Sequence, residues 1–268
     1  GPALATATLF FALVAHAGAN VINDYYDDIS GCDAANTERQ FPFTGGSRFI
    51  QNGVLSQRAT GVFGYALLAA VVPAGLWLTA VSDPGLILIG LAGLVVGWAY
   101  SAPPLKLQSR GLGEFAITAG WLLVVVGSDF VQRRGFAFLP VAAGLGFALL
   151  VANVLYINQF PDVKADGQAG KRTMVVRLGT GPARWGYVLI TALAYGWPLL
   201  MVLTGRLPLL ALLALLPLAA SIAATRVLWD GADKPAQLTP ALKLTILSAS
   251  AHGLLLAIAL ALPWGRPL

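Results

Sequence analysis

Two polar stretches of the chain combine asparagine and aspartate at the spacing of one helix face, and each follows a long apolar segment. The first stretch holds Asn20, Asn23, Asp24, Asp27, Asp28 and Asp33, and the second holds Asn158, Asp162 and Asp166. Spacings of three and four residues place side chains on the same side of an α-helix. Each stretch therefore presents a stripe of oxygen atoms. Pro161 predicts that the second helix begins or kinks there.

Such stripes suit a hard cation. Carboxylates four residues apart on a helix repel one another unless a cation lies between them. Mg²⁺ prefers oxygen ligands, and it commonly binds one or two carboxylates together with the phosphates of a substrate. Two facing sites could clamp a diphosphate, and bridging metal ions would stabilise it as a leaving group. The alternative is that these residues are ordinary solvated helix ends, but two motifs of similar spacing favour the metal site.

Further polar residues could bind phosphate. Lys171 and Arg172 follow the second stretch, and both side chains can pair with phosphate oxygens. Tyr100 and Lys106 lie on either side of a Pro-Pro pair that stiffens the chain between them. The alternative for the basic residues is the general excess of positive charge in the cytoplasmic loops of membrane proteins.

Composition predicts that the elements carrying these residues lie in a lipid bilayer. Of 268 residues, 57% are hydrophobic and 11% are charged, and the mean hydropathy is +0.74. Soluble domains are about 45–50% apolar and about 25% charged. Eight apolar segments have the length to span a membrane: residues 2–20, 59–80, 85–100, 112–131, 136–157, 183–203, 207–228 and 240–263. The sequence predicts an all-α fold, a polytopic membrane helix bundle that forms one domain over residues 1–268.

Two further classes of protein are excluded by composition. The net charge of +5 does not indicate nucleic-acid binding, because the basic residues lie in short loops between apolar segments. Cys32 is the only cysteine, which excludes an internal disulfide and a cysteine-based zinc site.

The distribution of basic residues predicts the orientation of the bundle. Four loops contain 13 of the 17 Lys and Arg residues: 21–58, 101–111, 160–184 and 226–243. The other side of the bundle holds only Arg133, Arg134, Arg206 and Arg266. An excess of Lys and Arg marks cytoplasmic loops, so both Asp-rich stretches face the cytoplasm. Eight spans then leave the N-terminus outside with no charge before Asp24, so we expect a further helix before Gly1. The alternative is a protein of eight spans.

Six short blocks carry a resemblance to a known family. They are residues 20–27 (NVINDYYD), 44–47 (TGGS), 100–104 (YSAPP), 110–114 (RGLGE), 162–166 (DVKAD) and 170–173 (GKRT). Their order and separation resemble the UbiA superfamily of intramembrane prenyltransferases over nearly the whole chain. The spacing of Asp27, Gly31 and Asp33 and the block 110–114 look most like the branch that uses 1,4-dihydroxy-2-naphthoate in menaquinone synthesis.

The resemblance implies a fold and a set of site residues. The family has nine helices, and the first Asp-rich motif belongs to its second helix, so the helix expected before Gly1 would be the first. Family motifs bind Mg²⁺ and a polyprenyl diphosphate, which assigns Asp27, Asp162 and Asp166 as ligands with support from Asn23, Asp24 and Asn158. Gly31 stands where the ubiquinone-type enzymes have another Asp, so Asp28 or Asp33 must supply that oxygen. Tyr100 and Lys106 match a Tyr/Lys pair near the diphosphate.

The resemblance also implies a reaction, namely Mg²⁺-dependent transfer of a polyprenyl group to an aromatic acceptor. For the naphthoate branch the acceptor loses its carboxylate as CO₂, at a site on the cytoplasmic side of the bacterial inner membrane. The acceptor's carboxylate would meet a basic residue, for which Arg172, Lys106 and Arg110 are the candidates. One alternative is another acceptor such as 4-hydroxybenzoate. A different class is a membrane transporter, which would place charges at the middle of the membrane rather than at its cytoplasmic face.

Overall fold

A computed structural model of the protein describes residues 1–262 and contains only helices and loops over that range. Residue 263 of the last predicted span and Arg266 lie outside the described residues. The α-helices are α1 (Pro2–Ile29), α2 (Cys32–Ala35), α3 (Gln57–Val81), α4 (Leu86–Ala99), α5 (Gly113–Arg133), α6 (Leu139–Gln168), α7 (Met174–Leu178), α8 (Thr180–Leu203), α9 (Leu218–Gly231) and α10 (Thr239–Ala261). The 3₁₀ helices are η1 (Leu107–Arg110), η2 (Leu209–Leu215) and η3 (Pro235–Gln237).

Long apolar runs become helices because a backbone in lipid must satisfy its own hydrogen bonds. Seven helical segments have the length and apolar character of membrane spans. They correspond to seven of the eight predicted spans and confirm a polytopic all-α protein in the membrane. The eighth, α4, has only 14 residues. It is about 21 Å long, which is shorter than the hydrocarbon layer of about 30 Å.

Apart from Asp33, which lies on α2, the two Asp-rich stretches lie on the last turns of unusually long helices. α1 has 28 residues and α6 has 30. These lengths correspond to about 42 and 45 Å, compared with about 30 Å of hydrocarbon. Each helix can therefore cross the apolar layer and still carry its final turns into a polar environment. α6 runs through Pro161 as one helix, so the second motif does not begin a new helix at that residue.

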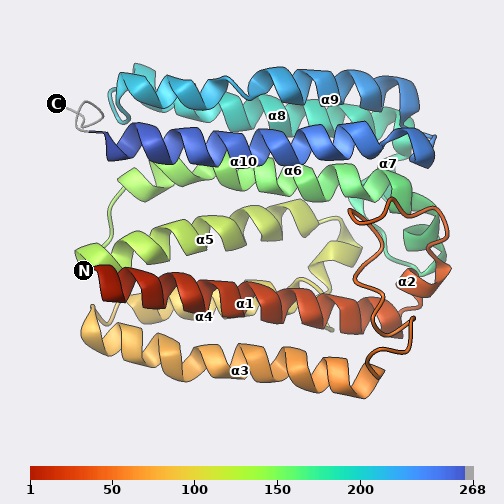
Figure 1. The fold of residues 1–268 in the computed structure, drawn as a ribbon, viewed down its shortest axis with the longest axis horizontal. Helices are drawn as coiled ribbons and strands as arrows, with labels where there is room; N and C mark the ends of the chain where they lie inside the picture. The colour runs from red at the N-terminus through yellow and green to blue at the C-terminus, as the bar shows by residue number, and fades with distance from the viewer. Residues whose placement is uncertain (263–268) are drawn as a thin grey trace.

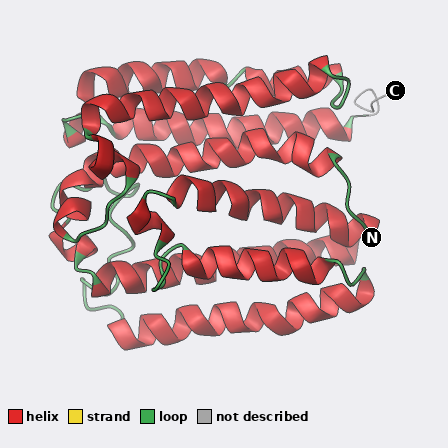
Figure 2. Ribbon diagram, turned by 180° about the vertical axis from the view of Figure 1, so that it is seen from behind, coloured by secondary structure: helices red, strands yellow, loops and turns green. Residues whose placement is uncertain are grey.

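The helices lie side by side in a bundle with two halves (Figures 1 and 2). α6 packs against α5, α8 and α10, while α1 packs against α3 and α5. The α5–α6 pair therefore joins the half made by α1, α3 and α4 to the half made by α8, α9 and α10 (Figure 1). The segments that include α2, α7 and the long loop 36–56 gather at one end of the bundle, where α1 and α6 end (Figure 1).

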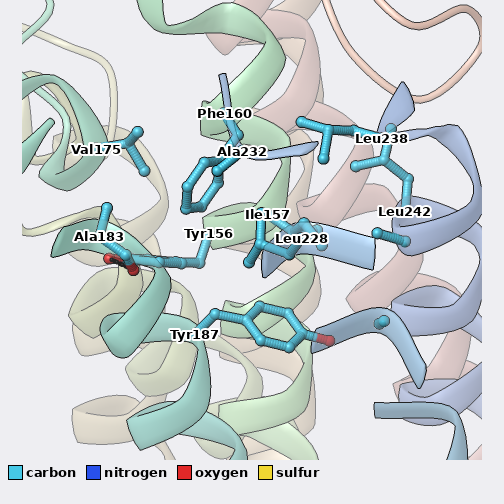
Figure 3. Close-up of a cluster of buried hydrophobic side chains, with 12 residues drawn as sticks. Tyr156, Ile157, Phe160, Val175, Ala183, Tyr187, Leu228, Ala232, Leu238 and Leu242 are labelled. Carbon is cyan, nitrogen blue, oxygen red and sulfur yellow. Dashed lines mark hydrogen bonds between the residues drawn. The ribbon is translucent and has the colours of Figure 1, made fainter. Parts of the chain in front are cut away.

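A buried hydrophobic cluster supports this end of the bundle (Figure 3). Tyr156, Ile157 and Phe160 of α6 pack there against residues of α7, α8, α9 and α10. The hydroxyl of Tyr156 donates a hydrogen bond of 2.8 Å to the carbonyl oxygen of Ala183 at the start of α8. The cluster fixes the second half of α6, which carries Asn158, Asp162 and Asp166.

Candidate active site

A cavity of about 400 Å³ opens at the end of the bundle where the loops gather. Its walls come from α1, α2, loop 36–47, the end of α4, η1, α6 and the segment that follows α6. The charged and amide side chains that line it are Asn20, Asn23, Asp24, Asp27, Asp33, Asn36, Gln108, Asn158, Gln159, Asp162, Asp166 and Lys171. The fold thus brings both Asp-rich stretches into one cavity.

The first motif is held in place by a hydrogen-bond network around Asp27. Asn23, one turn earlier on α1, donates to Asp27 Oδ2 at 3.1 Å and also lies 3.1 Å from Ser101 Oγ. Gln108 of η1 donates through Nε2 to Asp27 Oδ1 at 3.1 Å. Because Asp27 is only 8% exposed, these donors replace the water that the carboxylate would otherwise bind.

The second motif has its own set of partners. Asn36 donates to Asp162 Oδ1 at 2.7 Å, and the thiol of Cys32 lies 3.0 Å from Asp166 Oδ1. Asn158 donates through Nδ2 to the carbonyl oxygen of Phe43 at 3.3 Å. Its Oδ1 is buried and has no hydrogen-bond partner among the described residues. An unpaired buried acceptor costs free energy unless a donor or a cation satisfies it.

Lys171 links the two motifs. Its Nζ lies 2.9 Å from Asp27 Oδ2 and 3.7 Å from Asp166 Oδ1, so one ammonium group joins α1 to α6. Burial opposes the charge on Lys171, but the nearby carboxylates of Asp27 and Asp166 outweigh this effect and raise its pKa well above the usual value. Lys171 therefore supplies a positive charge to the cavity wall, between the two motifs.

The cavity remains strongly negative despite Lys171. Among the described residues that line it, five are aspartates and only Lys171 is basic. Burial, followed by repulsion from Asp27 and Asp24, raises the pKa of Asp33 to about 7. A site with this excess of carboxylate attracts cations. An anionic group would be repelled there unless cations offset part of this negative charge.

Several residues predicted to act at the site lie outside the cavity wall. Asp28 faces away from it and accepts hydrogen bonds from Gln51 at 3.0 Å and Gln57 at 2.7 Å. Of the two residues left open as the additional ligand, Asp33 lines the cavity and Asp28 does not. Lys106, Arg110 and Arg172 are exposed and do not line the cavity. Tyr100 lines it, as predicted.

Comparison with known proteins identifies the family. The sequence model of the UbiA prenyltransferase family matches residues 1–249. The chain belongs to the UbiA prenyltransferase family. It is therefore a membrane-embedded prenyltransferase.

Similar proteins from several bacteria are named as prenyltransferases that act on naphthalene-type acceptors. A 1,4-dihydroxy-2-naphthoate octaprenyltransferase of Bacillus subtilis is 26% identical over 97% of this chain and 82% of its own length. A protein of the same name from Escherichia coli is 28% identical over 68% of this chain and 60% of its own length. A 2-carboxy-1,4-naphthoquinone phytyltransferase of Synechocystis is 30% identical over 65% of this chain and 54% of its own length. The chain thus spans somewhat more than half of the last two relatives. No solved structure matches the chain.

UbiA enzymes generally depend on a divalent metal, so we asked whether the cavity could hold one. No group of three or more His, Cys, Asp or Glu side chains in residues 1–262 is arranged as a metal site. The oxygen donors nevertheless fit a metal that is completed by a substrate phosphate, because Mg²⁺ often takes only one or two carboxylates from the protein. The unpaired Oδ1 of Asn158, one turn from Asp162, would add a neutral oxygen to such a ligand set.

Several polar residues in or next to the cavity were not predicted from sequence. Gln108 donates to Asp27, Ser101 lies beside Asn23 and Gln108, and Asn36 donates to Asp162. They lie outside the long helices that carry the motifs, so no helical spacing relates them to a motif. Asn36 follows Asp33 closely, but its sequence position does not reveal that it pairs with an aspartate 126 residues later.

Proposed function

We propose that the protein transfers a polyprenyl group from a prenyl diphosphate to 1,4-dihydroxy-2-naphthoate, with loss of CO₂, in menaquinone biosynthesis. The main support is the convergence of two Asp-rich helix ends on one cavity at the end of a membrane bundle. The names of the relatives support the naphthoate acceptor, since both names specify an acceptor with a carboxylate on a naphthalene skeleton.

In this proposal the carboxylates hold the donor substrate. Asp27, Asp162 and Asp166, with Asn158, would hold Mg²⁺ against the diphosphate. Bound Mg²⁺ supplies positive charge that stabilises the departing diphosphate. Lys171 lies between the motifs and can pair with a phosphate oxygen without a change of protonation, because its raised pKa keeps it charged.

The reaction forms a C–C bond between the prenyl group and the acceptor ring, and it breaks the bonds to the diphosphate and to the carboxylate. The allylic C–O bond breaks and its electron pair leaves with the diphosphate, while the ring carbon that carries the carboxylate forms the new C–C bond. The carboxylate of the acceptor leaves as CO₂, so the ring recovers its electrons without an external oxidant. Phe43, Tyr100 and Leu155 line the cavity and limit the access of water to the reacting carbon.

The proposed location is the bacterial inner membrane, with the site facing the cytoplasm. The end of the bundle that holds the cavity also carries most of the Lys and Arg residues, which is typical of cytoplasmic loops. This side would give the site access to the water-soluble naphthoate and to the charged diphosphate head group of the other substrate.

The proposed function is tested by following the labelled carboxyl carbon of the acceptor during prenyl transfer. Purified protein is incubated in detergent with Mg²⁺, a polyprenyl diphosphate and 1,4-dihydroxy-2-naphthoate labelled at the carboxyl carbon. We expect a prenylated naphthoquinol without label, together with labelled CO₂. Label retained in the product, or turnover only with 4-hydroxybenzoate, would contradict the proposed acceptor.

A further inference from the structure

One ionisable side chain lies deep in the membrane and has no role in the site described above. His16 stands near the middle of α1, fourteen residues after Pro2 and thirteen before Ile29. Its side chain is exposed instead of packed in the core of the bundle. An ionisable residue within a membrane span is costly in lipid and generally marks a binding or transport site. His16 therefore calls for a ligand or a polar neighbour.

His16 is connected to the cavity through a single residue. Nδ2 of Asn20 lies 3.0 Å from Nε2 of His16, and Asn20 itself lines the cavity. On its other side, the imidazole ring lies 5.5 Å from the ring of Trp121 on α5. Trp121 in turn meets Phe147 of α6 edge-on, with ring centroids 5.6 Å apart. The His16–Asn20 pair thus leads from the polar cavity to aromatic rings on two other helices.

The depth of these residues suits a group bound on the membrane side of the diphosphate. Asn20 precedes Asp27 by seven residues on α1, which is about 10 Å along the axis. Trp121 lies eight residues beyond Gly113, and Phe147 lies eight residues before Leu155. Gly113 and Leu155 line the cavity, so the two aromatic residues lie about 12 Å farther along their helices, towards the other end of the bundle. The acceptor ring must attack the carbon next to the diphosphate, on the membrane side of the carboxylates.

We propose that His16 and Asn20 form the subsite that binds a hydroxyl group of the aromatic acceptor, with the acceptor ring against Trp121. A hydroxyl group both donates and accepts hydrogen bonds, and so do a neutral imidazole and a carboxamide. An aromatic neighbour such as Trp121 favours a flat, electron-rich ring over an aliphatic chain. The inference rests on the proposed function, because it assumes that the second substrate is a hydroxylated aromatic compound.

Selectivity for the hydroxyl group distinguishes a binding role of His16 from a purely structural role. Binding of 4-hydroxy-2-naphthoate and of 2-naphthoate, which lacks the hydroxyl, is measured with wild type, His16→Leu and His16→Gln. Gln keeps one donor and one acceptor at this position, whereas Leu keeps neither. Leu13→Ala is the matched control, since Leu13 is 59% exposed on the same helix. In parallel, KM is measured for the acceptor 1,4-dihydroxy-2-naphthoate and for the prenyl diphosphate.

We expect the wild type to bind the hydroxylated compound about tenfold more tightly than the other, the effect of a well-made hydrogen bond. His16→Leu should abolish this preference and raise KM for the acceptor about tenfold, with KM for the prenyl diphosphate changed less than about twofold. His16→Gln should retain most of the preference, and Leu13→Ala should behave as the wild type.

Two results would overturn the inference. One is an unchanged hydroxyl preference in His16→Leu, and the other is no preference or no binding in the wild type. Failure of the proposed function would be seen separately, as a wild type that binds 4-hydroxy-2-naphthoate with this preference but does not transfer a prenyl group to 1,4-dihydroxy-2-naphthoate.

Discussion

At the scale of single residues, Asp33 shows the effect of crowding five carboxylates into one cavity. Burial, and then the charges of Asp27 and Asp24, raise its pKa to about 7, compared with about 3.9 in an unfolded chain. Between these values the folded protein holds a proton that the unfolded chain has released. The free energy of unfolding should therefore fall as the pH rises from about 4 to about 7.

Thermal unfolding without metal tests this linkage. In EDTA, the wild type should have a higher Tm at pH 5.5 than at pH 8, and Asp33→Asn should show a smaller difference, because its amide does not ionise. Asp28→Asn is the matched control, since Asp28 lies outside the cavity. A pH dependence in Asp33→Asn as steep as that of the wild type would show that Asp33 is not the group that titrates.

Site residues on the helices could be predicted because helical periodicity relates them to one another. Asp27, Asp162 and Asp166 could be predicted because helical spacing and a repeated pattern set them apart. Lys171 could be predicted because it follows the second motif directly. Lys106 has a positive φ of 43° and an exposed side chain, while Gln108 reaches Asp27. No periodic pattern predicts which side chain of an irregular loop turns inward, so Lys106 and Gln108 could not be distinguished.

At the scale of elements, the position of α6 depends on how closely α8 approaches it. A Cβ atom added at Gly186 of α8 would overlap the hydroxyl of Tyr156, which is hydrogen-bonded to Ala183 at 2.8 Å. The missing side chain therefore allows the close contact that supports the second half of α6. On the same helix, Gly196 has nothing within 4 Å of its added Cβ.

This pair of glycines gives a matched test of helix packing. Gly186→Ala should lower the free energy of unfolding by about 1–3 kcal/mol, the usual cost of overpacking. Gly196→Ala should leave it unchanged or raise it slightly, because alanine favours the helix. The measurement is unfolding in detergent followed by intrinsic tryptophan fluorescence. Equal effects of the two substitutions would contradict the close contact between α6 and α8.

Helix positions could be predicted well because lipid imposes both the helix and its minimum length. The continuity of α6 through Pro161 could not be predicted. A proline can begin a helix or lie within one, and only the packing of the helix decides between these outcomes. The position of α4 could also be predicted, since residues 85–100 match Leu86–Ala99 to within one residue at each end. Where the helix ends depends on the turn at Tyr100 that brings η1 to the cavity.

At the scale of the whole molecule, the account requires that the cavity face the cytoplasm. Cys32 cannot report this, because it is 4% exposed and burial raises the pKa of its thiol. In a Cys32→Ser background, Asn52→Cys places an exposed thiol in the loop at the cavity end, and Thr204→Cys places one at the opposite end.

A membrane-impermeant maleimide should label Asn52→Cys in inside-out vesicles and Thr204→Cys in intact cells. The positive-inside rule gives this expectation, since the loops of the cavity end carry most of the basic residues. Labelling of Asn52→Cys in intact cells would reverse the orientation.

The most direct test of the central claim is diphosphate release, since the account assigns it to metal ions held by both Asp-rich helix ends. Asp27→Asn and Asp162→Asn should each slow Mg²⁺-dependent release from a polyprenyl diphosphate by about 100-fold or more, because each removes a charge that holds the metal. Asp129→Asn is the control, since Asp129 pairs with Arg133 on α5, far from the cavity. It should keep nearly full activity, and EDTA should abolish release in the wild type until Mg²⁺ is restored. Wild-type release by a folded Asp162→Asn protein would contradict the two-helix diphosphate site.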